Sequence, residues 1–418
     1  MNPKMQVADA YAGDPPVYPC KTRGKDGLKM KILHVIDSLI SVAGGPPVVA
    51  ASLATAQSGL GHEVALAYHT IDPEQSVVDD GEVPGLSGLE HVALPRRDHR
   101  RAPSKYLSHG DDRRLLPHVE RADVVHLHNI WEPVASVTGR LARMTKTPYL
   151  VTPHGMLHRW ALSQRRLKKR LALALGKRRL LARASCLHLV SPQEREEIAA
   201  LRLTTPGRVI PNGVWPDSID AAPPAGAFRA TLPAAAQNAP LALFLSRLHV
   251  KKGVDLLADV FKAAEAPEAH LVVVGPDGGM RSTLERRAHE LGLADRVHLV
   301  GPLYGRAKFE ALVDADVFVL PSRQEGHPVS VLEAMALGVP VVITEESHVP
   351  EAGQAGAGYV LPLDVKRLGG ALGMLLRDAT LRDEMGAKGR ELVRSTFTWP
   401  TVAERAVEVY REFLPRAA

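Results

Sequence analysis

The sequence has few of the residues that several classes of protein depend on. Aromatic side chains make up only 5% of the 418 residues, and no aromatic-rich run offers the stacking platform of a nucleic-acid binder. The two cysteines, Cys20 and Cys186, are too few for a disulfide framework or a cysteine metal cluster. No apolar run reaches the roughly 20 residues that span a bilayer, and no signal peptide precedes Met30. These absences favour a globular protein of a reducing cytoplasm.

Patterned structure begins only at Lys31. Residues 1–29 are rich in proline, glycine and charge, so we expect a disordered N-terminal tail or an extension ahead of a true start at Met30. The remaining length suits two domains of roughly 150–200 residues each.

Short apolar runs alternate with helical patterns along the rest of the chain, which is the doubly wound α/β pattern. The predicted strands are Ile32–Ile36, Glu63–Tyr68, Val124–Leu127, Tyr149–Thr152, Leu187–Val190, Val209–Pro211, Leu241–Leu245, His270–Val274, Val297–Val300, Val317–Leu320 and Val339–Ile343. The alternation stops at 218–240, which is rich in alanine and proline. We therefore predict two Rossmann-like domains, 30–217 and 241–398, joined by a linker at 218–240, with ligands at the carboxyl ends of the strands.

Two acids occur in the segment 315–344. The segment reads as a buried strand, a polar loop that contains Glu325, a helix that starts near Pro328 and stops at Gly338, and a second strand. Glu333 lies in the helix. Free backbone N–H groups at such a helix start favour a phosphate. By themselves, two glutamates at this spacing are more often a solvated loop acid and an exposed helix acid.

Two cations follow the strand predicted at Leu241–Leu245. Arg247 comes at the strand end, and Lys252 precedes the next helix. Such a pair can neutralise a diphosphate, and fixed cations accelerate the departure of a nucleoside diphosphate. Either residue alone would more often belong to a basic surface turn.

Together the two segments resemble the family 4 retaining glycosyltransferases, whose fold is GT-B. Glu325 and Glu333 match the family's E-x7-E motif, and Arg247 and Lys252 match its R-L-x-x-x-K-G motif. The resemblance implies that Glu325 contacts the donor sugar, that Glu333 holds the ribose, and that the two cations bind the pyrophosphate. It also implies two parallel sheets facing a central cleft.

Other positions match the family's donor site, and they are Gly44, Gly45, Gly275, Leu303, Gly326, His327, Pro328 and Val329. The family often has Phe-Gly-Leu where this chain has 327–329, so the donor sugar stays open. The resemblance covers nearly the whole chain from Lys31, and it implies that residues 399–418 form a terminal helix that crosses back to the first domain.

In the first domain, His154 precedes a glycine at a strand end and resembles the family's H-G element, which implies a contact with the donor sugar. The acceptor-side candidates are Asn129, Trp131 and Glu132. His126 and His128 suggest a metal pair, but the sequence places no third ligand. We therefore predict no metal, and no cofactor other than the nucleotide-sugar substrate.

The net charge of +6 is unevenly spread: residues 159–183 hold many cations and no acid, and a smaller basic cluster occupies 96–101. Within 165–183 leucines recur at three- to four-residue steps beside a basic face. This pattern fits a helix that packs on the core, and it also fits a helix attracted to anionic lipid.

The resemblance implies a hexosyltransferase that uses a UDP- or GDP-sugar and a saccharide acceptor, here expected to be lipid-linked. Exopolysaccharide or lipopolysaccharide synthesis in bacteria would suit it, in the cytoplasm or on the inner face of the cytoplasmic membrane. Three alternatives stay open: another GT-B enzyme (an inverting transferase or a sugar-nucleotide epimerase), a nucleotide-sugar-binding protein without turnover, and, ranked lowest, a nucleic-acid binder.

Overall fold

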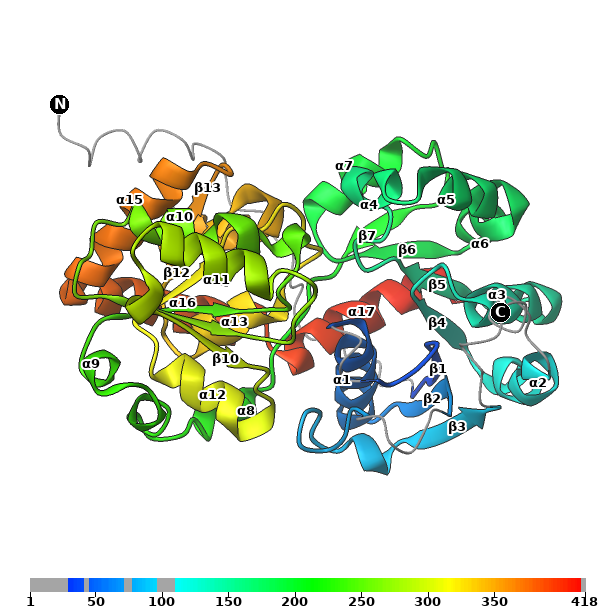
Figure 1. Cartoon of the computed structure of the whole chain (residues 1–418). Coiled ribbons are helices and arrows are strands. Elements are labelled where there is room, and N and C mark those ends of the chain that lie inside the picture. The colour runs from blue at the N-terminus through cyan, green and yellow to red at the C-terminus, as the bar shows by residue number, and fades with distance from the viewer. Residues whose placement is uncertain (1–28, 41–44, 71–76, 96–109, 415–418) are drawn as a thin grey trace. The chain divides into compact units, whose positions relative to one another are not determined.

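A computed structural model describes residues 29–40, 45–70, 77–95 and 110–414 (Figure 1). These residues form two compact units. The N-terminal unit comprises the described residues up to Asp217, with 326–329 and 396–414, and the C-terminal unit comprises 218–325 and 330–395. The tail predicted at 1–29 (apart from Lys29), Gly44 and the basic cluster at 96–101 lie outside the described residues.

The N-terminal unit is built on a seven-stranded parallel sheet of order β3-β2-β1-β4-β5-β6-β7. Its strands are β1 (Lys31–Val35), β2 (Glu63–His69), β3 (Glu90–Leu94), β4 (Val124–His128), β5 (Tyr149–Thr152), β6 (Cys186–Leu189) and β7 (Gly207–Val209). Its helices are α1 (Gly45–Gly59), α2 (Asp111–Arg121), α3 (Pro133–Thr145), α4 (Arg159–Ser163), α5 (Arg166–Ala172), α6 (Arg178–Ala182), α7 (Pro192–Ala199) and α17 (Trp399–Phe413).

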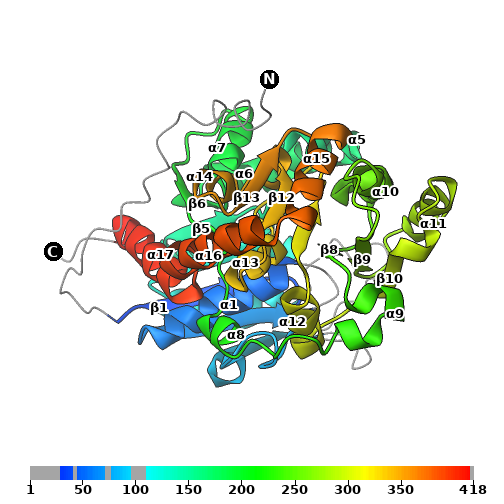
Figure 2. The same cartoon turned by 90° about the vertical axis from the view of Figure 1, so that its left-hand side faces the viewer.

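Helices cover both faces of this sheet, because its strands alternate apolar side chains between two cores. Residues of α1 and α17 pack with Ile32 and Val124 on one face, and residues of α2, α3 and α6 pack with Leu33 and Val125 on the other. The terminal helix α17 lies beside α1 (Figures 1 and 2).

The C-terminal unit holds a six-stranded parallel sheet of order β10-β9-β8-β11-β12-β13. Its strands are β8 (Leu241–Leu245), β9 (His270–Val274), β10 (Val297–Gly301), β11 (Val317–Leu320), β12 (Val341–Thr344) and β13 (Gly358–Leu361). The helices from the unit boundary onward are α8 (Pro216–Asp220), α9 (Ala234–Gln237), α10 (Val254–Lys262), α11 (Arg281–Glu290), α12 (Gly305–Val313), α13 (Val329–Ala336), α14 (Pro350–Gln354), α15 (Val365–Arg377) and α16 (Ala379–Thr396).

The prediction of two parallel α/β sheets is confirmed, and each predicted strand is present to within two residues at either end. Two strands were missed, β3 and β13. The edge strand β3 buries only Val92 and Leu94, so it lacks the continuous apolar run that marks a central parallel strand.

The alanine- and proline-rich stretch 218–240 was predicted to be a linker, but its contacts place it in the C-terminal unit. Phe228 and Leu232 are buried there. The Arg229 N–H donates to the carboxylate of Asp314 at 2.8 Å, and its guanidinium donates to Asp316 at 2.7 Å. Composition alone does not reveal this packing, since the anchoring side chains are few.

The basic segment 165–183 is not the single core-facing helix that was one of its two predicted forms. It forms α5, a π-helical turn at Leu173–Lys177 and α6, and Gly176 in the turn has φ 145°. Only the leucines near its end, 180 and 181, are buried. Leu167, Leu171 and Leu175 are 82%, 59% and 78% exposed. Across the described ranges, no helix combines the length and apolar character needed to cross a bilayer.

Candidate functional site

Two of the predicted donor-site residues meet beyond the carboxyl ends of β8 and β11. The Lys252 ammonium donates to both carboxylate oxygens of Glu325 at 2.6 Å, and the Ser322 hydroxyl donates to one of them at 2.6 Å. Glu325 is only 4% exposed. Burial by itself would raise the pKa of Glu325, but the ammonium of Lys252 and the hydrogen bonds outweigh it and hold that pKa below its ordinary value.

The turn that carries Lys252 is held tightly against β11. Gly253 has φ 70°, and a Cβ there would lie 1.8 Å from the carbonyl oxygen of Pro321. Only glycine allows this approach. The His249 ring accepts a hydrogen bond from the Lys251 N–H at 3.0 Å, which closes the other side of the turn.

The loops that follow β8 and β9 run against each other. Gly275 has φ 148°, and a Cβ on it would lie 1.9 Å from the carbonyl oxygen of Ser246. The Arg247 side chain in the first loop is exposed, and no described residue forms a hydrogen bond or an ion pair with it. Leu303, half-buried, follows β10. This edge of the sheet therefore offers one uncompensated guanidinium and one paired ammonium.

The helix predicted from Pro328 to Gly338 is present as α13, and Gly338 has φ 79°, as a C-terminal glycine cap requires. The Glu333 carboxylate on α13 accepts a hydrogen bond from the Lys308 ammonium on α12 at 2.7 Å. Glu325 and Glu333 thus each hold a lysine in the C-terminal unit. Residues 326–329 between them are grouped with the N-terminal unit, where the Asn212 side-chain amide donates to the His327 carbonyl at 2.7 Å.

A cluster of five histidines lies inside the N-terminal unit. His34 and His128 are joined by ring nitrogens 2.9 Å apart, and His128 and His154 by nitrogens 3.1 Å apart. His126 approaches His188 at 3.3 Å. They stand on β1, β4 and β6 and beyond the end of β5, so one face of the sheet brings them together.

The hydrogen bonds at one end of the cluster set its proton arrangement. His188 Nε2 donates to the Ile210 carbonyl at 2.8 Å, so its neutral ring faces His126 with a lone pair. His126 Nε2 then carries the proton, which it can share with Thr152 at 2.6 Å, and His126 Nδ1 accepts from the Tyr410 hydroxyl at 2.6 Å.

The same alternation of donors and acceptors continues through the side-chain amide of Gln57. Gln57 donates to the Tyr410 hydroxyl at 3.0 Å and accepts from His34 Nε2 at 2.7 Å. His34 Nδ1 accepts from His128, which in turn accepts from His154 Nε2. The chain of donors and acceptors leaves His154 Nδ1 as a lone pair.

Burial makes these rings neutral. It lowers the pKa of His34 and of His188 to about 4 and that of His154 to about 3. Burial and then the neighbouring rings lower the pKa of His126 and His128 well below the ordinary value.

The nitrogens of His34, His126 and His128 lie within 4.8 Å of one another, close enough for metal ligands. The same nitrogens also form the hydrogen bonds within the cluster. His34 is the third residue of this group, and the sequence did not place it beside His126 and His128. The register in which His34 pairs with His126 was the signal that could have found it.

The backbone next to His154 is held by a buried carboxylate that the sequence did not point to. Glu194, fully buried on α7, accepts hydrogen bonds from the N–H groups of Gly155 and Val190, both at 2.8 Å. Burial raises the pKa of Glu194 to about 7. His154 itself has φ 50°, a left-handed conformation that this clamp supports.

The acceptor-side candidates share one property. Asn129, Trp131 and Glu132 each present a buried polar atom (Oδ1, Nε1 and Oε2) for which the described part of the chain supplies no hydrogen-bond partner. Burial and then the neighbouring Asp37 raise the pKa of Glu132. Polar atoms in this condition are costly unless a ligand or water pairs with them.

Two family models match the chain. The model described as glycosyl transferases group 1 matches residues 233–392, and the glycosyl transferase 4-like domain matches residues 44–213. Between them they cover most of the chain, one on each unit.

Curated relatives match only part of the chain. A GDP-mannose-dependent monoacylated alpha-(1-6)-phosphatidylinositol monomannoside mannosyltransferase of Corynebacterium glutamicum is 34% identical over 174 residues, which are 39% of this chain and 45% of that protein. Mannosylfructose-phosphate synthase of Agrobacterium fabrum is 34% identical over 174 residues, or 39% and 38% of the two chains. The chain thus aligns with less than half the length of these relatives.

Solved structures resemble nearly the whole chain. Sucrose-phosphate synthase of Thermosynechococcus elongatus has a TM-score of 0.68 at 23% identity, over 92% of this chain and 99% of that one. The HepE protein of Anabaena, solved in complex with UDP, has a TM-score of 0.70 at 17% identity, over 92% and 100%. At these identities the likeness concerns the fold, which is GT-B.

Proposed function

The chain belongs to the group 1, family 4 glycosyltransferases, and we propose that it moves a hexosyl group from a UDP- or GDP-sugar to a saccharide acceptor with retention of configuration and without a metal ion. The observation that carries the proposal is the buried Lys252–Glu325 pair at the ligand edge of the C-terminal sheet. A buried ion pair is a weak source of stability, and perturbed, desolvated charges are typical of functional sites.

The Lys252 ammonium can exchange Glu325 for a bound diphosphate. A diphosphate that binds beside Arg247 would compete for the Lys252 ammonium and free the Glu325 carboxylate to accept hydrogen bonds from sugar hydroxyls. Glu333, held by Lys308, would accept from the ribose in the same way. Charge on the departing diphosphate grows in the transition state, and two fixed cations stabilise it there. These cations supply the charge that a metal ion would otherwise provide.

His154 suits the sugar side of the reaction. Its ring is neutral at neutral pH because burial lowers its pKa to about 3, and its Nδ1 lone pair can accept a hydrogen bond from a sugar hydroxyl. In the proposed step the acceptor hydroxyl oxygen bonds to the anomeric carbon from the leaving-group side. The bond to the diphosphate breaks, and the hydroxyl proton passes to a phosphate oxygen.

We further propose a lipid-linked acceptor and attachment to an anionic membrane surface from the cytoplasmic side. The segment 165–183 exposes Leu167, Leu171 and Leu175 among its cations, and each cation near an anionic surface adds on the order of 1 kcal/mol. The name of the Corynebacterium relative includes both GDP-mannose and a phosphatidylinositol acceptor, which supports a lipid-borne acceptor here. Such acceptors occur in bacterial exopolysaccharide and lipopolysaccharide synthesis.

The donor proposal is tested by thermal unfolding with UDP-, GDP- and ADP-sugars and their free diphosphates. A ligand at about 100 times its dissociation constant adds roughly 2.7 kcal/mol of stability. We expect one nucleotide class to stabilise the protein and Arg247→Gln/Lys252→Gln to abolish the effect. A folded protein that responds to none of them would contradict the proposal.

The membrane proposal is tested by co-sedimentation with phosphatidylglycerol and with phosphatidylcholine vesicles. We expect binding to the anionic vesicles only, and a loss of binding in Leu167→Ser/Leu171→Ser/Leu175→Ser. Met144→Ser is the matched control, because Met144 is a 68% exposed apolar side chain of the same unit outside the basic segment. Equal binding by the triple variant would exclude the leucines as a membrane contact.

A further inference from the structure

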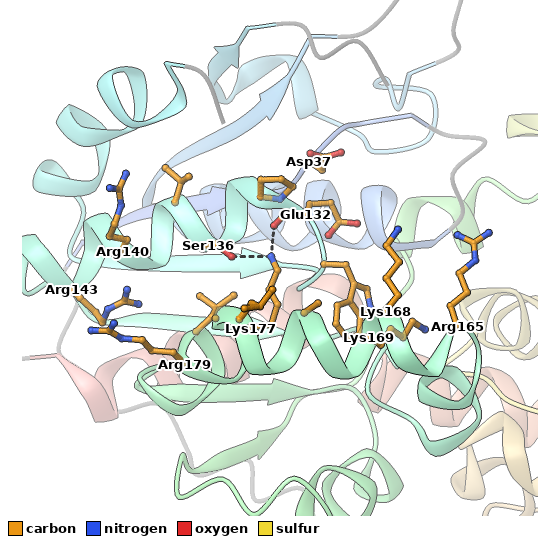
Figure 3. Close-up of a pocket in the computed structure, with 17 residues that line it drawn as sticks. Asp37, Glu132, Ser136, Arg140, Arg143, Arg165, Lys168, Lys169, Lys177 and Arg179 are labelled. Carbon is orange, nitrogen blue, oxygen red and sulfur yellow. Dashed lines mark hydrogen bonds between the residues drawn. The ribbon is translucent and has the colours of Figure 1, made fainter. Parts of the chain in front are cut away.

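The N-terminal unit contains a pocket of about 720 Å³ (Figure 3). Its walls come from the loop after β4, from α3, and from the segment α5–α6, and Asp37 reaches it from beyond β1. The volume lies in the range of pockets that enclose a small molecule. It lies partly at the carboxyl edge of the sheet, where His154 also stands.

The lining is strongly basic. Two carboxylates, Asp37 and Glu132, face seven cations, which are Arg140, Arg143, Arg165, Lys168, Lys169, Lys177 and Arg179. Like charges gathered in a concave space raise the local electrostatic potential and attract anions. This excess of cations therefore favours an anionic ligand.

Some of these cations form hydrogen bonds within the pocket wall, and others have no acidic partner among the described residues. The Lys177 ammonium donates to the Glu132 carbonyl at 2.7 Å and to the Ser136 hydroxyl at 2.8 Å, which fixes the π-helical turn against α3. Arg165 and Arg179 have no acid within ion-pair distance among the described residues. In Figure 3 they stand toward opposite ends of the pocket.

Two residues of the lining, Trp131 and Glu132, each hold a buried polar atom. The Trp131 indole N–H and the Glu132 Oε2 are buried without a partner in the described part of the chain. The Lys169 ammonium lies 5.5 Å from the centre of the Trp131 ring, a cation–π distance that keeps the ring in place. A hydrogen-bond donor and an acceptor next to several cations would suit a ligand that carries a sugar hydroxyl next to a phosphate.

We propose that this pocket is the acceptor site and that the acceptor carries a phosphate or diphosphate group, which the cations bind while Trp131 and Glu132 bind its sugar. The assignment of the pocket to the acceptor rests on the transferase function proposed above. The presence of an anion site in the pocket does not depend on that function. Leu175 lines the pocket and is 78% exposed, so an apolar tail on the phosphate would leave the pocket along α5.

The anion site is tested by calorimetric titration of the full chain with inorganic pyrophosphate. We expect two sites in the unaltered protein. Arg165→Gln/Arg179→Gln removes one cation from each end of the pocket, so a phosphate anywhere along it loses a neighbour. A hydrogen bond to a charged group is worth about 1.5–3 kcal/mol, so pocket binding should weaken about tenfold or more. Both side chains are exposed, so the variant should fold.

Two further variants separate the sites. Arg247→Gln/Lys252→Gln should lose donor-site binding and keep the pocket. Arg113→Gln/Arg202→Gln removes two exposed cations of the same unit outside the pocket and should keep both sites. The proposal is overturned if the Arg247/Lys252 variant, still folded by circular dichroism, binds no pyrophosphate.

The source of the phosphate is tested by displacing pyrophosphate from the Arg247/Lys252 variant. Displacement by glucose 1-phosphate would support a soluble sugar phosphate as the acceptor, and displacement only by phosphatidylcholine vesicles that carry farnesyl diphosphate would support a lipid-borne one. Displacement by neither would overturn the assignment of the pocket to the acceptor. A protein stabilised by no nucleotide would defeat the transferase proposal alone and leave the anion site standing.

Discussion

Acidification should destabilise the N-terminal unit, because five of its buried histidines are neutral in the folded state. The folded-state pKa of His34 and of His188 is about 4 and that of His154 about 3, against 6.5 in an unfolded chain. Between these values the unfolded state binds more protons than the folded state. The free energy of unfolding therefore falls as the pH falls below 6.5, and no dependence from these rings is expected above it.

The magnitude follows from the linkage relation. At pH 5 each ring whose folded pKa is near 4 or lower costs about 2 kcal/mol relative to pH 8. The three rings His34, His154 and His188 together cost about 6 kcal/mol. Burial also lowers the pKa of His126 and His128, so these rings add to the loss. Glu194 opposes this loss. Its pKa is raised to about 7, so its neutral folded form returns about 2–3 kcal/mol at pH 5. The raised pKa of Glu132 acts in the same direction. A net loss of about 3 kcal/mol or more is a large fraction of the stability of a typical domain.

Tryptophan fluorescence reports this unit alone, since all four tryptophans (Trp131, Trp160, Trp215 and Trp399) belong to it. Urea unfolding followed by fluorescence at pH 8 and at pH 5 measures the difference. Glu194→Gln, which removes the opposing group, should enlarge that difference by about 2–3 kcal/mol. A difference below about 2 kcal/mol in the unaltered protein would refute the neutral histidine cluster.

Two further predictions concern the C-terminal unit. Lys252→Ala should lower turnover by about 10²–10³-fold. It should also destabilise the unit by about 3 kcal/mol or more, because it leaves the buried Glu325 carboxylate unpaired. Lys252→Gln/Glu325→Gln should restore much of the stability in thermal unfolding and none of the turnover. Recovery of activity in that double variant would contradict the role of the pair. Gly253→Ala places a Cβ 1.8 Å from the Pro321 carbonyl, so it should displace the Lys252 turn and weaken nucleotide binding in calorimetry, whereas Gly370→Ala, whose Cβ meets nothing within 4 Å, should leave binding unchanged.

The sequence was most informative where one local pattern determines one element. The apolar runs predicted nearly all central strands, because a strand buried on both faces leaves a continuous signal. Lys252 and Glu325 were assigned to one site through the resemblance to the family's motifs. Both follow strands of one parallel sheet, whose carboxyl ends share an edge. Their direct ion pair, however, depends on the glycine-tight turn at Gly253, and spacing alone does not reveal it.

Features that depend on contacts between distant segments were not predicted. The histidine cluster joins four strands through Gln57 on α1 and Tyr410 on α17, and no single stretch of sequence contains more than two of its rings. The basic segment was expected to form one helix because leucine periodicity does not reveal the break at Gly176 or the exposure of Leu175. Leu175 and Gly176 at that break both line the basic pocket.

Binding and cleavage of a nucleotide-sugar with retention can be measured together. The protein is incubated with the nucleotide-sugar that stabilises it, with EDTA present and water as the acceptor, and the anomeric protons are followed by NMR. We expect slow release of nucleoside diphosphate and of a sugar with the donor's anomeric configuration, both lost in Arg247→Gln/Lys252→Gln. A donor that stabilises the protein but is never cleaved, or a product of inverted configuration, would contradict the proposed function.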